Sequence, residues 1–238
     1  YILLEKMKIG IIGAIEQEIR KIKEIINNLK IKKIGNIKIY TGTFKKIEIF
    51  LILSGIGKVS ASMSTTISIN LFQPDFIINS GSAGSLNACL KIGDIIIPKK
   101  TCYYDVDLTN FGYSKGQIPE YPQTFKTNKN LREILKEIAV EFKFKFLTGL
   151  LVTGDSFIRK SNCIKKIKNQ FSSAIGVDME STAIGQVCHN FKIPFIIIKS
   201  ISDLSDNNAT SHFEKNIPIA SLKSSKLVKL LLKKISSQ

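Results

Sequence analysis

Short apolar runs of strand length alternate along the chain with longer segments that have helical spacing. The strand-like runs are "KIGIIGA", "IKIYTG", "IEIFLILSG", "DFIINSGSAG", "GDIIIP", "FLTGLLVTGD", "AIGVDM" and "PFIIIKSISD". Several are continuously apolar, which is typical of strands buried on both faces. Helical spacing predicts helices over residues 16–30, 58–72, 128–142, 161–171 and 180–190, and a last one ending near Lys234. The alternation predicts an α/β fold of three layers, α/β/α, around a central mixed, mostly parallel sheet.

The chain shows no repeat or flexible linker that would divide it. Its 238 residues, 44% of them hydrophobic, suffice for a sizeable core. We expect one domain over residues 7–238 and an upstream extension over residues 1–6, because a clean strand pattern starts after Met7. Charged residues interrupt the first apolar run, so no signal peptide is expected. No apolar segment is long enough to span a membrane, so no membrane partner is expected.

The formal net charge of +16 first suggests a nucleic-acid partner, because lysine and arginine neutralise phosphates. The make-up of the cations argues against it. Of 35 cationic residues only Arg20, Arg132 and Arg159 are arginines, and the lysines are scattered. Proteins that read phosphates and bases usually use the planar arginine fork. Solvated lysine faces, with no nucleic-acid partner, are therefore the favoured interpretation, and DNA affinity at physiological salt would test the alternative.

The cysteines and histidines show no spacing that suits a metal. They are Cys89, Cys102, Cys163, Cys188, His189 and His212. No C-x-x-C pair occurs among them. Reduced, buried thiols in a cytoplasmic protein are the expectation.

Small or acidic residues follow six of the strand-like runs. The segments are "GAIEQE", "SGIGK", "NSGSAGS", "TGDSF", "VDMEST" and "SISDLSD". In α/β folds ligands bind at this edge of the sheet. Asp203 follows a buried run, and a carboxyl with a pKa raised by desolvation would suit a general acid. Glu18 and Glu180 equally fit helix N-terminal capping. "SGIGK" lacks P-loop spacing and "GIIGAI" lacks the dinucleotide-binding spacing.

Ordered blocks along nearly the whole chain carry a resemblance to a known family. They include "KIGIIGAIEQE", "SGIGKVSA", "IINSGSAGSL", "FGYSKGQIP", "GLLVTGDSFI", "VDMESTAI" and "ISDLSD". The sequence resembles the 5′-methylthioadenosine/S-adenosylhomocysteine nucleosidases of the purine nucleoside phosphorylase superfamily. The resemblance implies a phosphorylase/hydrolase-like fold and hydrolysis of the N-glycosidic bond of these two nucleosides, and of 5′-deoxyadenosine, without metal or organic cofactor. It leaves the ranking of these substrates open. The implied roles are methionine salvage and removal of a methyl-cycle by-product.

The resemblance also implies site residues. Asp203 would protonate N7 of adenine, and Glu18 would deprotonate or orient the attacking water. Glu180 would accept hydrogen bonds from the ribose hydroxyls, whereas Asp178 is expected to be structural. The other implied substrate-binding residues are Ser82, Gly84, Phe157, Ile158, Met179, Ser202 and Phe213.

Departures from the family pattern occur at three positions. Lys199 stands where arginine is usual, which is expected to weaken the orientation of Glu18 or of the water. Ile15 replaces a common methionine and should matter less. Pro218 falls inside the last helix, which "SHFE" would open as a capping box, and a kink there would shift Phe213.

The family resemblance further implies a homodimer, in which the segment from Phe111 to Pro119 helps to build the neighbour's pocket. The alternative for this segment is a lid within one subunit. The alternative for the reaction is phosphorolysis, which needs a cationic phosphate site. None of the three arginines lies in the glycine-rich blocks, so hydrolysis is favoured.

Overall fold

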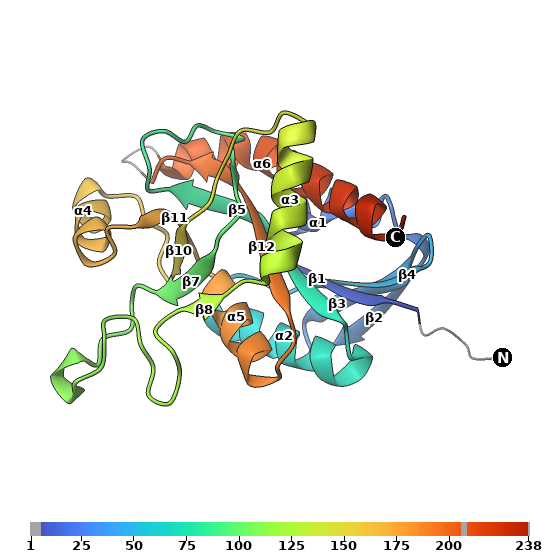
Figure 1. The fold of residues 1–238 in the computed structure, drawn as a ribbon, viewed down its shortest axis with the longest axis horizontal. Coiled ribbons are helices and arrows are strands. Elements are labelled where there is room, and N and C mark those ends of the chain that lie inside the picture. The colour runs from blue at the N-terminus through green and yellow to red at the C-terminus, as the bar shows by residue number, and fades with distance from the viewer. Residues whose placement is uncertain (1–5, 206–208, 238) are drawn as a thin grey trace.

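The computed structural model describes residues 6–205 and 209–237. Its strands form one mixed sheet with helices on both faces (Figure 1). The strands are β1 (Lys8–Gly13), β2 (Asn27–Ile34), β3 (Ile37–Phe44), β4 (Ile47–Leu53), β5 (Phe76–Ser85), β6 (Ile95–Ile96), β7 (Lys100–Tyr103), β8 (Phe125–Lys126), β9 (Phe146–Leu147), β10 (Leu150–Thr153), β11 (Ala174–Asp178) and β12 (Phe195–Asp203). The helices are α1 (Glu16–Lys23), α2 (Lys58–Phe72), the 3-10 helix η1 (Thr109–Phe111), α3 (Lys129–Glu141), α4 (Ser161–Gln170), α5 (Ser181–Asn190) and α6 (Ala209–Ile235).

Most of the central strands of the sheet pair in parallel. The strand order is β2-β3-β4-β1-β5-β11-β10-β7-β8, and β12 pairs with both β5 and β6. Ile11 of β1 aligns with Leu51 of β4 on one side and with Ile78 of β5 on the other. β12 runs parallel to β5, whereas β11 meets the end of β5 antiparallel. The expectation of a mixed sheet is confirmed, and six of the eleven strand pairings among the described residues are parallel.

Two helical layers cover the sheet because side chains alternate between its faces. Ile9 and Ile11 of β1 pack in one core cluster with residues of α1, α3 and α6. Ile12 packs on the opposite face in a cluster with residues of α2 and α5. The figure shows α1, α3 and α6 above the sheet and α2 and α5 below it (Figure 1). The predicted three-layer architecture is therefore confirmed.

Most predicted helices are present with nearly the expected bounds. The helix at 58–72 coincides with α2, and those at 128–142, 161–171 and 180–190 agree with α3, α4 and α5 to within one residue at each end. Asn128 caps α3 by accepting a hydrogen bond from the amide of Leu131 at 3.0 Å. Such caps satisfy otherwise unpaired amides of the first turn.

The predicted helix over 16–30 is wrong in its second half. Helix α1 ends at Lys23, and residues 27–34 form β2, which pairs antiparallel with β3. Apolar residues and lysines alternate only over residues 29–32, and the strand is exposed along nearly all its length. Pairing with β3, rather than burial, thus decides its structure. Strands β7 and β8 were also not predicted from the apolar runs.

Helix α6 continues through Pro218. The predicted capping box at "SHFE" is wrong, because the helix already includes Ala209, ahead of Ser211. Proline inside a helix removes one main-chain hydrogen bond. The shift of Phe213 by a kink stays a prediction. Of the expected extension over 1–6, residues 1–5 lie outside the described part of the chain.

Replacing Ile198, fully buried in β12, by alanine should lower the free energy of unfolding by about 2–5 kcal/mol, because the packed core leaves a cavity. The matched control is Ile31→Ala on the exposed strand β2, where the side chain is 66% exposed and a change within about 0.5 kcal/mol is expected. Urea denaturation measures both. Equal effects at the two positions would contradict the assignment of the core.

Candidate functional site

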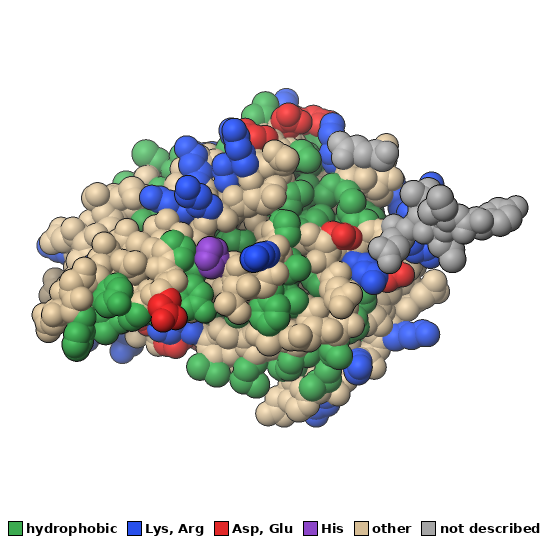
Figure 2. Space-filling model, turned by 60° about the horizontal axis from the view of Figure 1, so that its bottom comes forward, with side chains coloured by type: hydrophobic (Ala, Val, Ile, Leu, Met, Phe, Trp, Pro, Cys, Tyr) green, Lys and Arg blue, Asp and Glu red, His purple; other side chains and the backbone are tan. Residues whose placement is uncertain are grey.

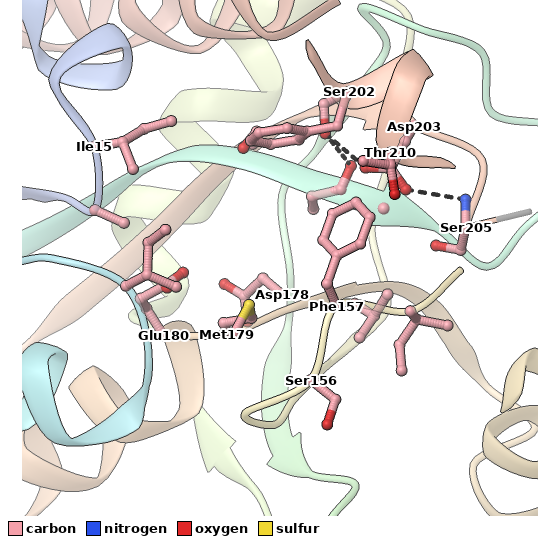
Figure 3. A pocket seen from close by; sticks show the side chains of 18 of the residues that line it. Ile15, Ser156, Phe157, Asp178, Met179, Glu180, Ser202, Asp203, Ser205 and Thr210 are labelled. Atoms are coloured by element: carbon pink, nitrogen blue, oxygen red, sulfur yellow. Dashed lines mark hydrogen bonds between the residues drawn. The ribbon is translucent and has the colours of Figure 1, made fainter. Parts of the chain in front are cut away.

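A cavity of about 450 Å³ lies at the carboxyl ends of β1, β5, β11 and β12 (Figure 3). Its lining residues are Ala14, Ile15, Glu18, Ile56, Ser82, Ala83, Gly84, Ser156, Phe157, Ile158, Val177, Asp178, Met179, Glu180, Ser202, Asp203, Ser205, Thr210, Phe213 and Glu214. All ten residues that were predicted to be catalytic or substrate-binding within the subunit are among them. The structure therefore brings them together, while their individual roles remain predictions.

Glu18 is held at the first turn of α1 by donors from two elements. Its side chain is only 3% exposed. Oε2 accepts a hydrogen bond from the amide of Ala14 at 2.8 Å, and Oε1 accepts from both the amide and the hydroxyl of Ser82, at 2.8 and 2.9 Å. The amide of Ile15 also donates to Oε2 at 3.4 Å, so Glu18 does cap its helix. The carboxylate of Glu18 therefore both caps α1 and lines the cavity.

Two glycines of β5 make room for the acidic side chains. A Cβ atom at position 81 would overlap the carboxylate of Glu18. A Cβ atom at position 84 would overlap the hydroxyl of Ser205 and lie 2.9 Å from Oδ1 of Asp203. The glycine-rich block "NSGSAGS" is thus needed for the close approach of β5 to two carboxylates.

Asp203 ends β12 on the opposite side of the cavity from Glu180 (Figure 3). It is 2% exposed. The hydroxyl of Ser202 donates to Oδ2 at 2.9 Å, and the amide of Ser205 donates to Oδ1 at 3.0 Å. These donors fix the orientation of the carboxyl group toward the cavity.

Asp178 was expected to be structural, and the structure places it both at the base of α5 and in the wall of the cavity. Oδ1 accepts a hydrogen bond from the hydroxyl of Thr153 at 2.6 Å, and Oδ2 accepts from the amide of Ser181 at 3.2 Å. Lys199 approaches Oδ2 to 3.1 Å. Asp178, and not Glu180, therefore caps α5, since the side chain of Glu180 makes no capping hydrogen bond.

Glu180 is buried beside the cavity and has one amide and one cation as partners. Its Oε1 accepts a hydrogen bond from the amide of Gly57 at 2.9 Å, and its Oε2 lies 3.9 Å from Nζ of Lys199. Burial raises the pKa of Glu180 to about 7, an effect that Lys199 opposes and that Asp178 and Glu18 reinforce. Burial therefore favours the neutral form of the Glu180 carboxyl group, and the ammonium of Lys199 favours the ionised form.

Lys199 was expected to act on Glu18 or the water. It forms ion pairs with Asp178 and Glu180, and the negative charge of Glu18 also raises the pKa of Lys199. The sequence patterns did not predict these ion pairs, nor the hydrogen bond from the amide of Gly57 to Glu180. One signal was present in the sequence. A single lysine inside the apolar run "PFIIIKSIS" must be buried, and a buried ammonium requires an anion nearby.

Aromatic and apolar side chains form another part of the cavity wall. The rings of Phe157 and Phe213 meet edge to face, with centroids 5.7 Å apart and an interplanar angle of 74°. Phe157 is 41% exposed, whereas Ile158 is buried and Met179 half-buried. Apolar walls with a few convergent polar groups are typical of small-molecule sites.

Two of the predicted residues lie away from this cavity. Phe111 ends η1 and is 77% exposed, and Pro119 is half-buried. Neither lines the cavity. Their loop projects from the body of the molecule at the lower left of Figure 1.

The lining residues include five carboxylates and, within the described chain, no lysine or arginine. The acidic residues are Glu18, Asp178, Glu180, Asp203 and Glu214. No group of three His, Cys, Asp or Glu side chains in residues 6–205 and 209–237 is arranged to hold a metal ion.

Comparison with known proteins identifies the family. The family model of the phosphorylase superfamily matches residues 8–233. A 5′-methylthioadenosine/S-adenosylhomocysteine nucleosidase of Buchnera aphidicola subsp. Acyrthosiphon pisum (strain Tuc7) is 59% identical over 229 residues, which are 96% of this chain and 99% of that protein.

Solved structures agree with this finding. The nucleosidase of the same name from Neisseria meningitidis, in complex with methylthio-immucillin-A, has a TM-score of 0.94 and 38% identity, covering 95% of this chain and 99% of that one. The S-adenosylhomocysteine nucleosidase from Streptococcus pyogenes, in complex with 5-methylthiotubericidin, has a TM-score of 0.95 and 34% identity, covering 98% of each chain. The chain therefore belongs to the phosphorylase superfamily and, within it, to the 5′-methylthioadenosine/S-adenosylhomocysteine nucleosidases.

Proposed function

We propose that this protein hydrolyses the N-glycosidic bond of 5′-methylthioadenosine and S-adenosylhomocysteine, and also that of 5′-deoxyadenosine, to release adenine and the 5′-substituted ribose. The observation that carries the proposal is the convergence of Glu18, Glu180 and Asp203, from three distant parts of the chain, on one cavity. The names of the similar proteins support the choice of substrate. A cavity of about 450 Å³ is also of the size that small-molecule sites have.

The chemistry uses the carboxyl groups in different protonation states. As the C1′–N9 bond breaks, negative charge builds on adenine and positive charge on the ribosyl ring. Asp203 donates a proton to N7, so that adenine leaves as a neutral base. Glu18 accepts a proton from water while the water oxygen bonds to C1′. Asp203 loses one proton and Glu18 gains one, so the number of protons on the protein is unchanged. Proton exchange with solvent then restores both groups.

The remaining lining residues bind the substrate. Glu180 accepts hydrogen bonds from the ribose hydroxyls, and Met179 packs against the sugar. Phe157 stacks on adenine, and the main chain of Ile158 contacts its edge. Phe213 covers the 5′-substituent. The edge-to-face contact between the rings of Phe157 and Phe213 supports this placement of the base beside the 5′-substituent, because the two rings form one continuous wall.

Three small residues support the carboxyl groups. Ser82 donates two hydrogen bonds to Glu18 and so fixes the base that acts on water. Ser202 donates to Asp203 and orients the acid. Gly84 leaves the space in which Asp203 lies and brings the backbone close to the substrate.

Water, rather than phosphate, is the second substrate in this proposal. The described lining residues carry five carboxylates and no cationic side chain, so the electrostatic potential inside the cavity disfavours an anion. The three arginines of the chain lie elsewhere. A neutral water molecule is not repelled.

The proposal extends to a homodimer. Hydrophobic side chains are exposed on the face that carries α2 and α5 (Figure 2). Val59 and Met63 lie one turn apart on α2 and are 70% and 53% exposed. Ile56, 57% exposed, both lines the cavity and adjoins this surface. The loop from Phe111 to Pro119 would then reach the partner's cavity.

The cellular setting is also part of the proposal. The enzyme would act in the cytoplasm, in methionine salvage and in removal of a by-product of methyl transfer, as a single domain over residues 7–238. The four cysteines are free thiols, which supports a reducing compartment, although Cys89 and Cys163 are exposed and not buried as expected. Among the described helices, none has the length and apolar character needed to cross a bilayer.

Adenine release from 5′-methylthioadenosine should proceed at full rate in phosphate-free buffer, because water is the nucleophile. Chromatography of the products with and without added phosphate measures this. Formation of a ribose 1-phosphate, or turnover that requires phosphate, would contradict hydrolysis.

Asp203→Asn and Glu18→Gln should each lower kcat by about 100-fold or more, because each amide removes one proton-transfer group while keeping the shape of the side chain. The control is Glu137→Gln on the exposed face of α3, which should leave kcat unchanged. Steady-state kinetics of adenine release compare the three variants. Near-normal kcat in Asp203→Asn would refute the role of Asp203 as the acid.

Val59→Glu combined with Met63→Glu should convert the protein from a dimer to a monomer in sedimentation experiments, because two buried charges would oppose the interface. The matched control is Val140→Glu on α3, which is 68% exposed and lies on the other helical layer. A wild-type protein that sediments as a monomer would contradict the dimer.

A further inference from the structure

The largest fully buried side chain in the described residues is charged. It is Lys199, in the middle of β12, with 1% of its surface exposed. The strand pairs with β5 on one side and with β6 on the other, and the side chain is shielded from bulk water. A buried ammonium without compensating anions is strongly unfavourable. The anions that pair with Lys199 therefore indicate its role.

The two partners of Lys199 differ in how they are held. Asp178, 3.1 Å from Nζ, is fixed by hydrogen bonds from Thr153 and Ser181. Glu180, 3.9 Å from Nζ, has a hydrogen bond from the amide of Gly57 on its other oxygen. Asp178 thus anchors the ammonium group, and the ammonium faces the one carboxylate of the pair that the substrate would contact.

We propose that the buried Lys199–Asp178 ion pair is a positioning device for Glu180, in which Asp178 fixes the ammonium and the ammonium keeps Glu180 an acceptor for the ribose hydroxyls. The inference rests on the proposed function, in which Glu180 binds ribose. Neither Lys199 nor Asp178 takes part in the proton transfers.

The electrostatics of the cluster agree with this geometry. Burial favours the neutral acid form of Glu180 and raises its pKa to about 7, whereas Lys199 favours the ionised form. Burial alone would lower the pKa of Lys199, but Asp178, Glu18 and Glu180 outweigh it and raise this pKa to about 12. The ammonium therefore stays charged throughout the range in which Glu180 titrates.

Other charges around Glu180 do not replace this cation. Glu18 faces it from α1 with the same sign as Asp178. On the α2 side Lys58 is paired with Asp105 at 2.7 Å and with Asp155 at 3.8 Å. Asp203 lies across the cavity. In the described part of the chain, Lys199 is the one cation that forms an ion pair with Glu180.

The test is the pH dependence of kcat/KM for 5′-methylthioadenosine from about pH 5 to about pH 9, which reports groups of the free enzyme. Wild-type kcat/KM should fall as the pH drops below about 7, the pKa of Glu180. Glu180→Gln should abolish this acid limb. Lys199→Met removes the cation and should move the limb to higher pH. A move of about one unit corresponds to about tenfold lower kcat/KM at acid pH, with recovery at alkaline pH.

Two further variants separate charge from structure. Lys199→Gln also removes the cation and should move the acid limb to higher pH, the same direction as Lys199→Met. Lys199→Arg keeps the charge and should leave the limb in place. Thermal melting shows whether each variant is folded, and Lys199→Gln decides by direction even if Lys199→Met does not fold.

A purely structural Lys199 would lower activity by the same factor at every pH and leave the acid limb where it is, which would overturn the inference. A limb in Lys199→Gln that stays in place or moves to lower pH would also overturn it. Failure of the wild-type protein to release adenine would instead contradict the proposed function, so the two failures are distinguishable.

Discussion

Burial of carboxylates around one cavity is the constraint on which the rest of the structure depends. The carboxylates of Glu18, Asp178, Glu180 and Asp203 are all buried, and a buried anion is tolerated only with hydrogen bonds or a cation close by. Main-chain amides and hydroxyls from neighbouring strands and loops supply most of these partners. Lys199 supplies the one buried positive charge among them. The sheet is therefore the scaffold that brings donors from distant segments to the same edge.

Strand β5 has a central part in this scaffold. It pairs with β1 and β12 along its length and with β11 at its end, so it separates the strands that carry the acidic residues. Gly81 and Gly84 lie on this strand where side chains would overlap Glu18 and the surroundings of Asp203. The same two residues that weaken a strand in general are required here, because the site needs the backbone of β5 close to both carboxylates.

The sequence predicted those parts of the structure that follow from local pattern. Helix α2 was predicted with its observed bounds, although apolar side chains such as Val59 and Met63 lie on its exposed side. The segments that carry Glu18, Glu180 and Asp203 were found because acidic residues lie at or shortly after the ends of apolar runs. The pairing of Lys199 with Asp178 was not predicted. It depends on the lateral order of the strands, in which β5 lies between β11 and β12, and local sequence carries no information on that order. Strand β2 was missed for the same reason, since its partner β3 rather than its own burial defines it.

The net charge of +16 and the acidic cavity are compatible because they act over different distances. Exposed lysines on the surface are screened by salt within about 10 Å. Inside the cavity the lower effective dielectric makes the nearby carboxylates dominate. In the proposed reaction positive charge develops on the ribosyl ring, and fixed negative groups beside it stabilise that charge without reorganising. The same carboxylates repel one another, which raises the pKa of Glu180 beyond the effect of burial. Lys199 lies behind the cavity wall, so its positive charge reduces this repulsion without lying in the path of the substrate. This explains why the positive charge is buried in β12 rather than exposed in the cavity.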